Sequence, residues 1–487
     1  MVAAGHPLTA EAGARVLREG GNAVDAAVAA MLVSWVAEPL LSGPGAGGYM
    51  LVAGAGETPT LLDFFVAAPG HGAPAGARGE LLPVDVSFGD VTQAFNVGPA
   101  SCGTPGNPAG VVDALARWGT IALTDLARPA AEHARRGVPV NAEQAYVFEI
   151  LGAILVSSPE AAALFAPEGG LLRAGDLFRS AELGDCIERL GSGGAEPFYE
   201  GDVAAALVDW LAPRGGLLTR ADLAGYTTVA REPARASYRG REVLTNPPPS
   251  AGGALLALAM AELDAAPGPP PLASVVSAME SAQAQRTPEF VAGLADEGFL
   301  EHFLGSRLGS TTHISVLDGD GRACSVTCTN GEGSGVVVPG TGVHVNNIMG
   351  EEDLNPLGFF GFEPGRRMPS MMSPTVVLGS DGVELVVGSA GSNRIRSAIL
   401  QTIVGVVDHG LEAEDAVVAP RVHFEAGVVY AEPGVPVQEL GETGHTVESF
   451  GARNLFFGGV QAVRRDPGTG AVTGAGDPRR GGAAVAQ

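Results

Sequence analysis

The sequence contains no lysine, so arginine supplies all 29 of its basic side chains. Aspartate and glutamate together number 54, and the formal net charge is −25 at pH 7. A charge of this sign and size repels the phosphates of nucleic acids and the headgroups of anionic membranes. We therefore expect neither a nucleic acid nor a membrane surface as a partner.

Cysteine is also scarce, and the four cysteines lack the spacing of a metal site. Cys324 and Cys328 lie four residues apart in a strand-like run, which is too far along a strand for an easy disulfide bond. The other two are Cys102 and Cys186. This pattern favours a reducing compartment. We expect no metal and no other cofactor.

Long apolar runs are missing as well. The longest, Ala26–Val36, is too short to cross a bilayer and is typical of a buried helix. The N-terminus has no basic start followed by an apolar core and a small-residue cleavage site, as a secretory signal would have. From these absences we expect a cytoplasmic protein.

Apolar residues and turn residues are abundant. The chain of 487 residues is 46% hydrophobic and contains 71 glycines and 35 prolines. Because apolar runs recur throughout, these glycines and prolines indicate tight turns rather than disorder. The length fits two modest domains or one large two-layer domain.

The first half of the chain shows helical signals separated by glycine turns. Residues 9–19 predict a helix capped by Thr9, and Asn22 opens a second helix that is apolar on most sides. The loop 43–48 formally matches G-x-G-x-x-G, but a helix precedes it and a strand follows, the reverse of a dinucleotide site. We interpret it as a close-packed turn. Residues 264–310 begin with PGPPP and turn polar, which indicates a surface segment.

The most informative stretch begins at residue 311 with TTHISVLDGDG. Alternating residues predict a strand with one apolar and one polar face. The apolar face carries Thr312, Ile314 and Val316. The polar face carries Thr311, His313 and Ser315.

Residues 318–321 form a hairpin turn, and the chain returns over Arg322–Thr329. If the loop has three residues, the register places Thr311 opposite Thr329, with side chains about 5 Å apart on one side of the sheet. A two-residue loop would break this pairing. Farther along, two strands and a glycine turn precede a helix that starts near Asn393, and the backbone amides of such a junction suit an oxyanion.

Several strings, taken together and in order, resemble the γ-glutamyltranspeptidase family of N-terminal-nucleophile hydrolases. They cover nearly the whole chain. The strings are GGNAVDAAVAA (20–30), SGPGAGGYML (42–51), FYEGDVA (198–204), GGLLTRADLAGY (215–226), YRGREV (238–243), NPPPSAGG (246–253), TTHISVLDGDG (311–321), GSGVVVPGTGV (333–343), NN (346–347), SPT (373–375) and GDPRRGG (476–482).

The resemblance implies a four-layer αββα sandwich and a precursor that cuts itself in two. The implied cut falls between Ser310 and Thr311, which gives a large segment 1–310 and a small segment 311–487 that together form one intertwined domain. Thr311 is the implied nucleophile and Thr329 its hydrogen-bonding partner. We expect two subunits from one precursor, and a dimer of these.

The chemistry of an N-terminal threonine fits this role. A threonine hydroxyl is a poor nucleophile until a base takes its proton. A free α-amine has a pKa near 8 and supplies that base, whereas the amide of the uncut chain does not. Self-cleavage therefore creates the active site. On this logic His313 is not needed as a base, and we interpret it as structural.

Further site residues follow from the resemblance. Gly391 and Ser392 align with paired glycines whose N–H groups hold the oxyanion. Asn330, Glu351 and Ser370 align with residues that bind the substrate.

The sequence departs from the family pattern at residues that bind the acyl group in the family. Phe65 replaces an arginine that clamps the glutamyl α-carboxylate, and phenylalanine cannot form that clamp. Met371 replaces a serine. The candidates for a replacement charge are Arg366, Arg367 and Arg394, although a structural salt bridge is the simpler role for each.

The predicted function is that of a self-cleaved amide hydrolase or acyltransferase with an acyl-threonine intermediate. It transfers a γ-glutamyl or related acyl group, glutathione-type substrates included, from a small-molecule amide to water or an amine. One alternative is an N-acyl amidase with a more apolar acyl pocket, and another is an unprocessed binding protein without catalysis. A weaker third alternative is a serine amidase that uses Ser42 or Ser389, neither of which lies in a nucleophile-elbow motif.

Overall fold

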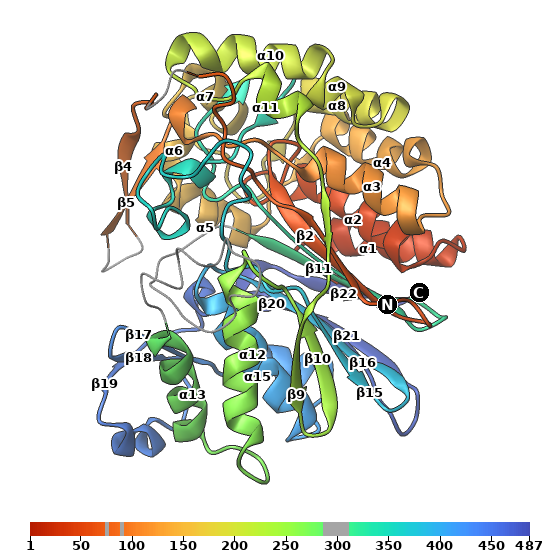
Figure 1. Ribbon diagram of the computed structural model, residues 1–487, viewed down its shortest axis with the longest axis vertical. Coiled ribbons are helices and arrows are strands. Elements are labelled where there is room, and N and C mark those ends of the chain that lie inside the picture. Colours follow the sequence, from red (N-terminus) through yellow and green to blue (C-terminus); the bar gives the residue numbers. More distant parts are fainter. Residues whose placement is uncertain (74–76, 88–91, 286–310) are drawn as a thin grey trace.

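The protein is a sandwich of two antiparallel sheets covered on each outer face by helices (Figure 1). A computed structural model describes residues 1–73, 77–87, 92–285 and 311–487. The predicted αββα architecture is confirmed. Within the described residues, no helix combines the length and the apolar character needed to span a bilayer.

Among the described residues, the first sheet has seven strands and the second has six, and each contains strands from both sides of residue 311. The two terminal strands β1 and β22 pair with each other, so the chain ends lie together (Figure 1). The first sheet runs β22 (Ala483–Val485), β1 (Val2–Ala4), β11 (Thr312–Leu317), β12 (Arg322–Thr329), β2 (Gly47–Gly54), β3 (Thr60–Phe64) and β8 (Val229–Arg231). The second runs β21 (Val472–Gly476), β20 (Gly459–Arg465), β16 (Gly382–Ala390), β15 (Thr375–Gly379), β10 (Arg241–Thr245) and β9 (Ala234–Tyr238).

Two apolar cores hold these layers together. One lies between the first sheet and its helices, and the other includes side chains from the facing sides of both sheets and from the second helical layer. The first layer contains α1 (Pro7–Arg18), α2 (Ala23–Ala37), α3 (Asn107–Trp118), α4 (Leu123–Arg136) and α8 (Ala181–Gly193). The second contains α12 (Ala251–Asp264), α13 (Leu272–Ala284) and α15 (Arg394–Val407). All of α2 is buried, as its apolar sequence predicted, and Asn22 caps it.

Shorter elements complete the fold. The helices are α5 (Ala142–Ile150), α6 (Gly152–Leu155), α7 (Pro159–Phe165), α9 (Glu196–Tyr199), α10 (Asp202–Leu211), α11 (Arg220–Ala224) and α16 (Ala413–Val418). The strands are β4 (Leu82–Ser87), β5 (Thr92–Val97), β6 (Val138–Pro139), β7 (Leu177–Phe178), β13 (Val337–Val338), β14 (Val343–His344), β17 (Val422–Glu425), β18 (Val428–Ala431) and β19 (Thr446–Ser449).

The predicted cap of the first helix was wrong. Helix α1 begins at Pro7, and His6 caps it by accepting a hydrogen bond from the Leu8 N–H at 3.1 Å. The hydroxyl of Thr9 instead donates to the buried carboxylate of Glu38 at 2.8 Å. Thr9 therefore links α1 to the end of α2.

The interpretation of residues 264–310 as a surface segment was also wrong in part. Residues 272–284 form α13, and Val275, Val276 and Met279 are buried in the second core. Residues 286–310 lie outside the described part of the chain.

The predicted register of the central hairpin is confirmed. Thr312 pairs with Cys328 and Leu317 with Ala323, so one further step places Thr311 opposite Thr329. Both faces of β11 are buried. Its apolar face packs on the first helical layer, and its polar face meets the second sheet.

His313 holds this polar face together. Its Nδ1 lies 2.8 Å from Thr327 Oγ1 and its Nε2 lies 3.0 Å from Ser315 Oγ. Ser315 in turn donates to the Gln461 carbonyl of the second sheet at 3.0 Å. Burial lowers the pKa of His313 to about 3, so the imidazole is neutral at neutral pH. This supports the structural interpretation of His313.

Gly388 leaves the space that the His313 ring fills, because a Cβ at residue 388 would overlap the imidazole. We expect Gly388→Ala to lower the free energy of unfolding by about 1–3 kcal/mol, the usual cost of overpacking a core. Chemical denaturation would measure it. Gly170→Ala is the control, because a Cβ at residue 170 meets nothing within 4 Å. Equal losses in the two variants would contradict this account of the sheet interface.

Candidate active site

The two threonines of the predicted site lie at the same edge of the first sheet. Thr311 directly precedes β11 and is 3% exposed, and Thr329 is the last residue of β12. The Thr329 hydroxyl accepts a hydrogen bond from the Gly331 N–H at 2.8 Å. Ser310, on the other side of the predicted cut, lies outside the described residues.

The predicted oxyanion loop joins β16 to α15. Gly391 has φ of +116° and Ser392 has φ of +50°, and α15 begins at Arg394, directly after Asn393, close to its predicted start. A Cβ at residue 391 would lie 3.0 Å from the Cα of Gly458. Both the left-handed φ and this close approach favour glycine at residue 391. The loop thus presents backbone at the N-terminal end of a fourteen-residue helix, where partial positive charge accumulates.

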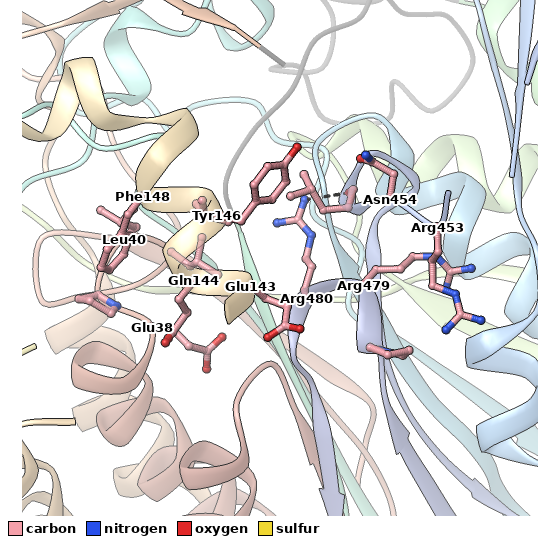
Figure 2. A pocket seen from close by; sticks show the side chains of 15 residues that line it. Glu38, Leu40, Glu143, Gln144, Tyr146, Phe148, Arg453, Asn454, Arg479 and Arg480 are labelled. Carbon is pink, nitrogen blue, oxygen red and sulfur yellow. Dashed lines mark hydrogen bonds between the residues drawn. The ribbon is translucent and has the colours of Figure 1, made fainter. Parts of the chain in front are cut away.

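A cavity of about 340 Å³ is lined by Glu38 and Arg480, which lie next to these two parts of the site (Figure 2). Glu38 lines it on one side and bonds to Thr312, the neighbour of Thr311. Arg480 lines it on another side, and its Nη2 lies 3.4 Å from the position of a Cβ on Gly391. The cavity therefore places the start of β11 and the oxyanion loop at the same end of the sandwich.

Glu38 is a buried carboxyl group that the sequence analysis did not identify. The Thr312 hydroxyl lies 2.6 Å from its Oε2 and the Thr9 hydroxyl 2.8 Å from its Oε1. Burial raises the pKa of Glu38 to about 7, and the two hydroxyl bonds partly oppose this rise. The sequence does contain one sign that Glu38 is buried: it directly follows α2, a helix whose side chains are almost entirely apolar.

Arg480 was also missed, although it lies in the matched string GDPRRGG. Sequence spacing gives no sign that the C-terminal residues return to the oxyanion loop. They do so because β21 pairs with β20, and β20 pairs with β16.

On the acyl side, the structure brings Asn330 and Glu351 together around Gly331. A side chain at residue 331 would overlap the Glu351 carboxylate, and the side-chain amide of Asn330 is buried without a hydrogen-bond partner. Burial, followed by the charges of Glu332 and Asp353, raises the pKa of Glu351 well above its usual value. This neighbourhood favours a positively charged group.

Phe65 is fully buried and packs on Tyr49, with ring centroids 5.4 Å apart. Ser370 and Met371 lie on the loop before β15, and both are buried. The Ser370 hydroxyl accepts a hydrogen bond from the Met372 N–H at 3.0 Å. Where the family has an arginine, this chain therefore has an aromatic ring in a packed core.

Two of the three arginines considered as replacement charges have partners within the fold. Arg367 lies 3.1 Å from Asp63 Oδ1 and donates to the Phe65 carbonyl at 2.9 Å. Arg394 lies 3.9 Å from Glu425 and 4.3 Å above the Phe456 ring. These contacts favour structural roles for both side chains.

The serine alternatives have little support in the geometry. Ser389 Oγ donates to the Ala390 carbonyl at 2.9 Å and accepts from the Gly459 N–H at 3.2 Å. Ser42 is fully buried, 3.4 Å from the Asn107 side chain. Among the described residues, no group of His, Cys, Asp and Glu side chains is arranged to hold a metal ion.

The four-layer sandwich, with a threonine opening a central strand opposite a second threonine, defines the class of N-terminal-nucleophile hydrolases. The family profile described as gamma-glutamyltranspeptidase matches residues 9–299 and 300–487. The chain therefore belongs to the γ-glutamyltranspeptidase family.

Known relatives include both glutathione hydrolases and acylases. The glutathione hydrolase proenzyme of Bacillus subtilis (strain 168) is 31% identical over 542 residues, covering 100% of this chain and 91% of the relative. The acylase ACY 1 proenzyme of Pseudomonas sp. (strain V22) is 32% identical over 524 residues, covering 100% and 93%. The crystal structure of cephalosporin acylase from Bacillus halodurans has a TM-score of 0.82 at 27% identity, covering 100% of this chain and 95% of that one. The protein is thus an enzyme that hydrolyses or transfers acyl groups.

Glu38 makes stability depend on pH, because its folded pKa of about 7 exceeds the ordinary value of 4.5. Below pH 4.5 both the folded and unfolded states hold the proton. As pH rises from 4.5 to 7, Glu38 loses its proton in the unfolded state before it does so in the folded state. The free energy of unfolding therefore falls over this range. We expect the free energy of unfolding of the wild type, relative to Glu38→Gln, to fall by roughly 3 kcal/mol between pH 4.5 and pH 8.

Urea unfolding at several pH values would measure this difference. Glu168→Gln is the control, because Glu168 is exposed. A constant difference between the wild type and Glu38→Gln across this range would show that the pKa of Glu38 is the same in the folded and unfolded states, and would contradict the raised value.

Proposed function

We propose that the protein cuts itself before Thr311 and then uses Thr311 to hydrolyse or transfer the acyl group of a small-molecule amide. The observation that carries the proposal is the hairpin register that sets Thr311 opposite Thr329. Two further features support it: the left-handed Gly391–Ser392 turn before α15, and the buried polar groups around Glu351.

In the first step, Thr311 Oγ attacks the Ser310 carbonyl carbon. The peptide C–N bond breaks, an ester forms, and the nitrogen takes the hydroxyl proton to become a free amine. Water then opens the ester and leaves a carboxylate on Ser310 and an N-terminal Thr311. In this proposal the hydroxyl of Thr329, which lies opposite Thr311 in the hairpin, holds Thr311 during this step.

In the mature enzyme, the Thr311 amine takes the proton of its own hydroxyl. The oxygen attacks the amide carbonyl, and the N–H groups of Gly391 and Ser392 stabilise the negative charge that develops on the carbonyl oxygen. The amine leaves with the proton, and Thr311 carries the acyl group as an ester. Water or a second amine then takes the acyl group and restores the hydroxyl.

The acyl group lies, in this proposal, between Asn330, Glu351, Ser370, Met371 and Phe65. Glu351 and Asn330 favour a polar, positively charged substituent, whereas Phe65 and Met371 favour an apolar chain. Because Phe65 replaces the arginine clamp, an N-acyl amide with an apolar acyl chain fits better than a γ-glutamyl amide. The acylase names among the relatives support this preference.

We further propose that the two subunits stay together, that they pair with a second copy, and that no cofactor is needed. Interleaving of strands from both sides of residue 311 supports continued association. The cytoplasmic location expected from the sequence also remains a proposal, supported by four buried cysteines that form no disulfide bond.

Self-cleavage gives the first test. Purified protein should separate on a denaturing gel into fragments of 310 and 177 residues, and N-terminal sequencing should find a chain that begins Thr-Thr-His-Ile. Thr311→Ala should remain a single chain of 487 residues. Ser42→Ala and Ser389→Ala should still cleave. One intact band in the wild type after long incubation would instead support the non-catalytic alternative.

Chromogenic anilides test the acyl preference. We expect kcat/KM for an apolar N-acyl anilide to exceed that for the γ-glutamyl anilide by at least about tenfold, because the charged α-carboxylate lacks its partner. Thr311→Ala serves as the blank. Efficient turnover of the γ-glutamyl anilide at micromolar concentration would contradict the altered acyl pocket while leaving the nucleophile assignment intact.

A further inference from the structure

We propose that the cavity beside the oxyanion loop is the subsite for the amine portion of the substrate, and that Arg480 binds a carboxylate carried by that amine. The inference rests on the proposed function, since it takes Thr311 as the reacting residue. By microscopic reversibility the same subsite serves the leaving amine and the accepting amine.

The position of the cavity assigns it to the amine side. It is lined by residues of four separate segments, around Glu38, Gln144, Asn454 and Arg480 (Figure 2). None of the five residues predicted to hold the acyl group lines it. A substrate amide has two substituents, an acyl group and an amine. The cavity reaches the oxyanion loop through Arg480 and touches none of the predicted acyl residues. It therefore fits the amine.

Arg480 differs from the two other arginines near Asp477. Arg421 lies 2.8 Å from Asp477, and Arg479 lies 3.1 Å from Asp477 and forms a second ion pair with Glu432. In the part of the chain that the structure describes, no carboxylate lies within ion-pair distance of Arg480. Its Nε is buried without a hydrogen-bond partner, and its Nη2 makes only a long bond of 3.4 Å to the Leu455 carbonyl.

Two glycines leave room for the Arg480 side chain at this position. A Cβ on Gly459 would overlap the aliphatic stem of Arg480, and a Cβ on Gly391 would lie 3.4 Å from Nη2. The guanidinium therefore lies beside the oxyanion loop with unused donors. Burial lowers the pKa of Arg480 to about 10, which still leaves it charged at neutral pH. A planar guanidinium with free donors suits a carboxylate.

The other residues that line the cavity indicate the chemistry of the ligand beyond its carboxylate. Leu40, Val147, Phe148 and Leu455 give the cavity an apolar side. Its volume of about 340 Å³ lies within the range of small-molecule sites. The subsite therefore fits an amine that carries both a carboxylate and an apolar body, as an aromatic or branched amino acid does.

Calorimetric titration with L-phenylalanine and L-phenylalaninamide tests the subsite without requiring turnover. We expect the wild type to bind phenylalanine at least about tenfold more tightly than the amide, because one charge-assisted hydrogen-bonded pair is lost with the amide. Arg480→Gln should abolish this preference, and Arg480→Lys should keep part of it. Arg465→Gln is the matched control, because Arg465 lies on β20 and does not line the cavity.

Thermal melting of each variant establishes that it is folded. Equal binding of the two ligands by the wild type, no detectable binding of either, or a preference that survives in Arg480→Gln would each overturn the inference. Self-cleavage before Thr311 is measured separately on the same preparations. Failure of this subsite can therefore be told apart from failure of the proposed function.

Discussion

The pairing of β11 with β12 is the constraint on which the rest of the site depends. Its register carries Thr311 to a position opposite Thr329, and a slip of one strand by one residue would turn its threonine to the other face of the sheet. The turn at residues 318–321 sets this register from one end. At the other end, β12 continues into the loop that holds Asn330 and Gly331. The hairpin thus fixes the geometry of the proposed nucleophile and of the proposed acyl site together.

Burial on both faces makes this register rigid. The apolar side chains of β11 pack on α2, and the polar ones form a hydrogen-bonded group between the sheets that is centred on His313. Unpaired polar groups are costly in such a place, so Ser315 and Ser325 bond to carbonyls of the second sheet. The polar side chains of β11 and β12 therefore hold the two sheets in a fixed position relative to each other.

Charge is distributed unevenly around the predicted nucleophile. Glu38 lies on one side with a pKa of about 7, and Glu351 lies on the acyl side with its pKa also raised by burial. Arg480 supplies positive charge beside the oxyanion loop. A carbonyl oxygen that gains negative charge near Gly391 would meet backbone dipoles and a guanidinium rather than these carboxyl groups. This arrangement suits attack on an amide, in which charge develops on that oxygen.

The sequence by itself determined the buried helix α2, the strand β11, the hairpin register and the helix that starts after Asn393, because each depends on local periodicity, turn length or capping. The layered fold followed from the resemblance of several sequence strings to a known family. The sequence did not reveal the cap at His6 or the burial of α13, since tertiary packing overrides propensity at helix ends and behind proline-rich turns. Only the tertiary structure brought Glu38 and Arg480 to one cavity. Those residues are separated by most of the chain, and the strand order β21-β20-β16 is what returns the C-terminus to the oxyanion loop.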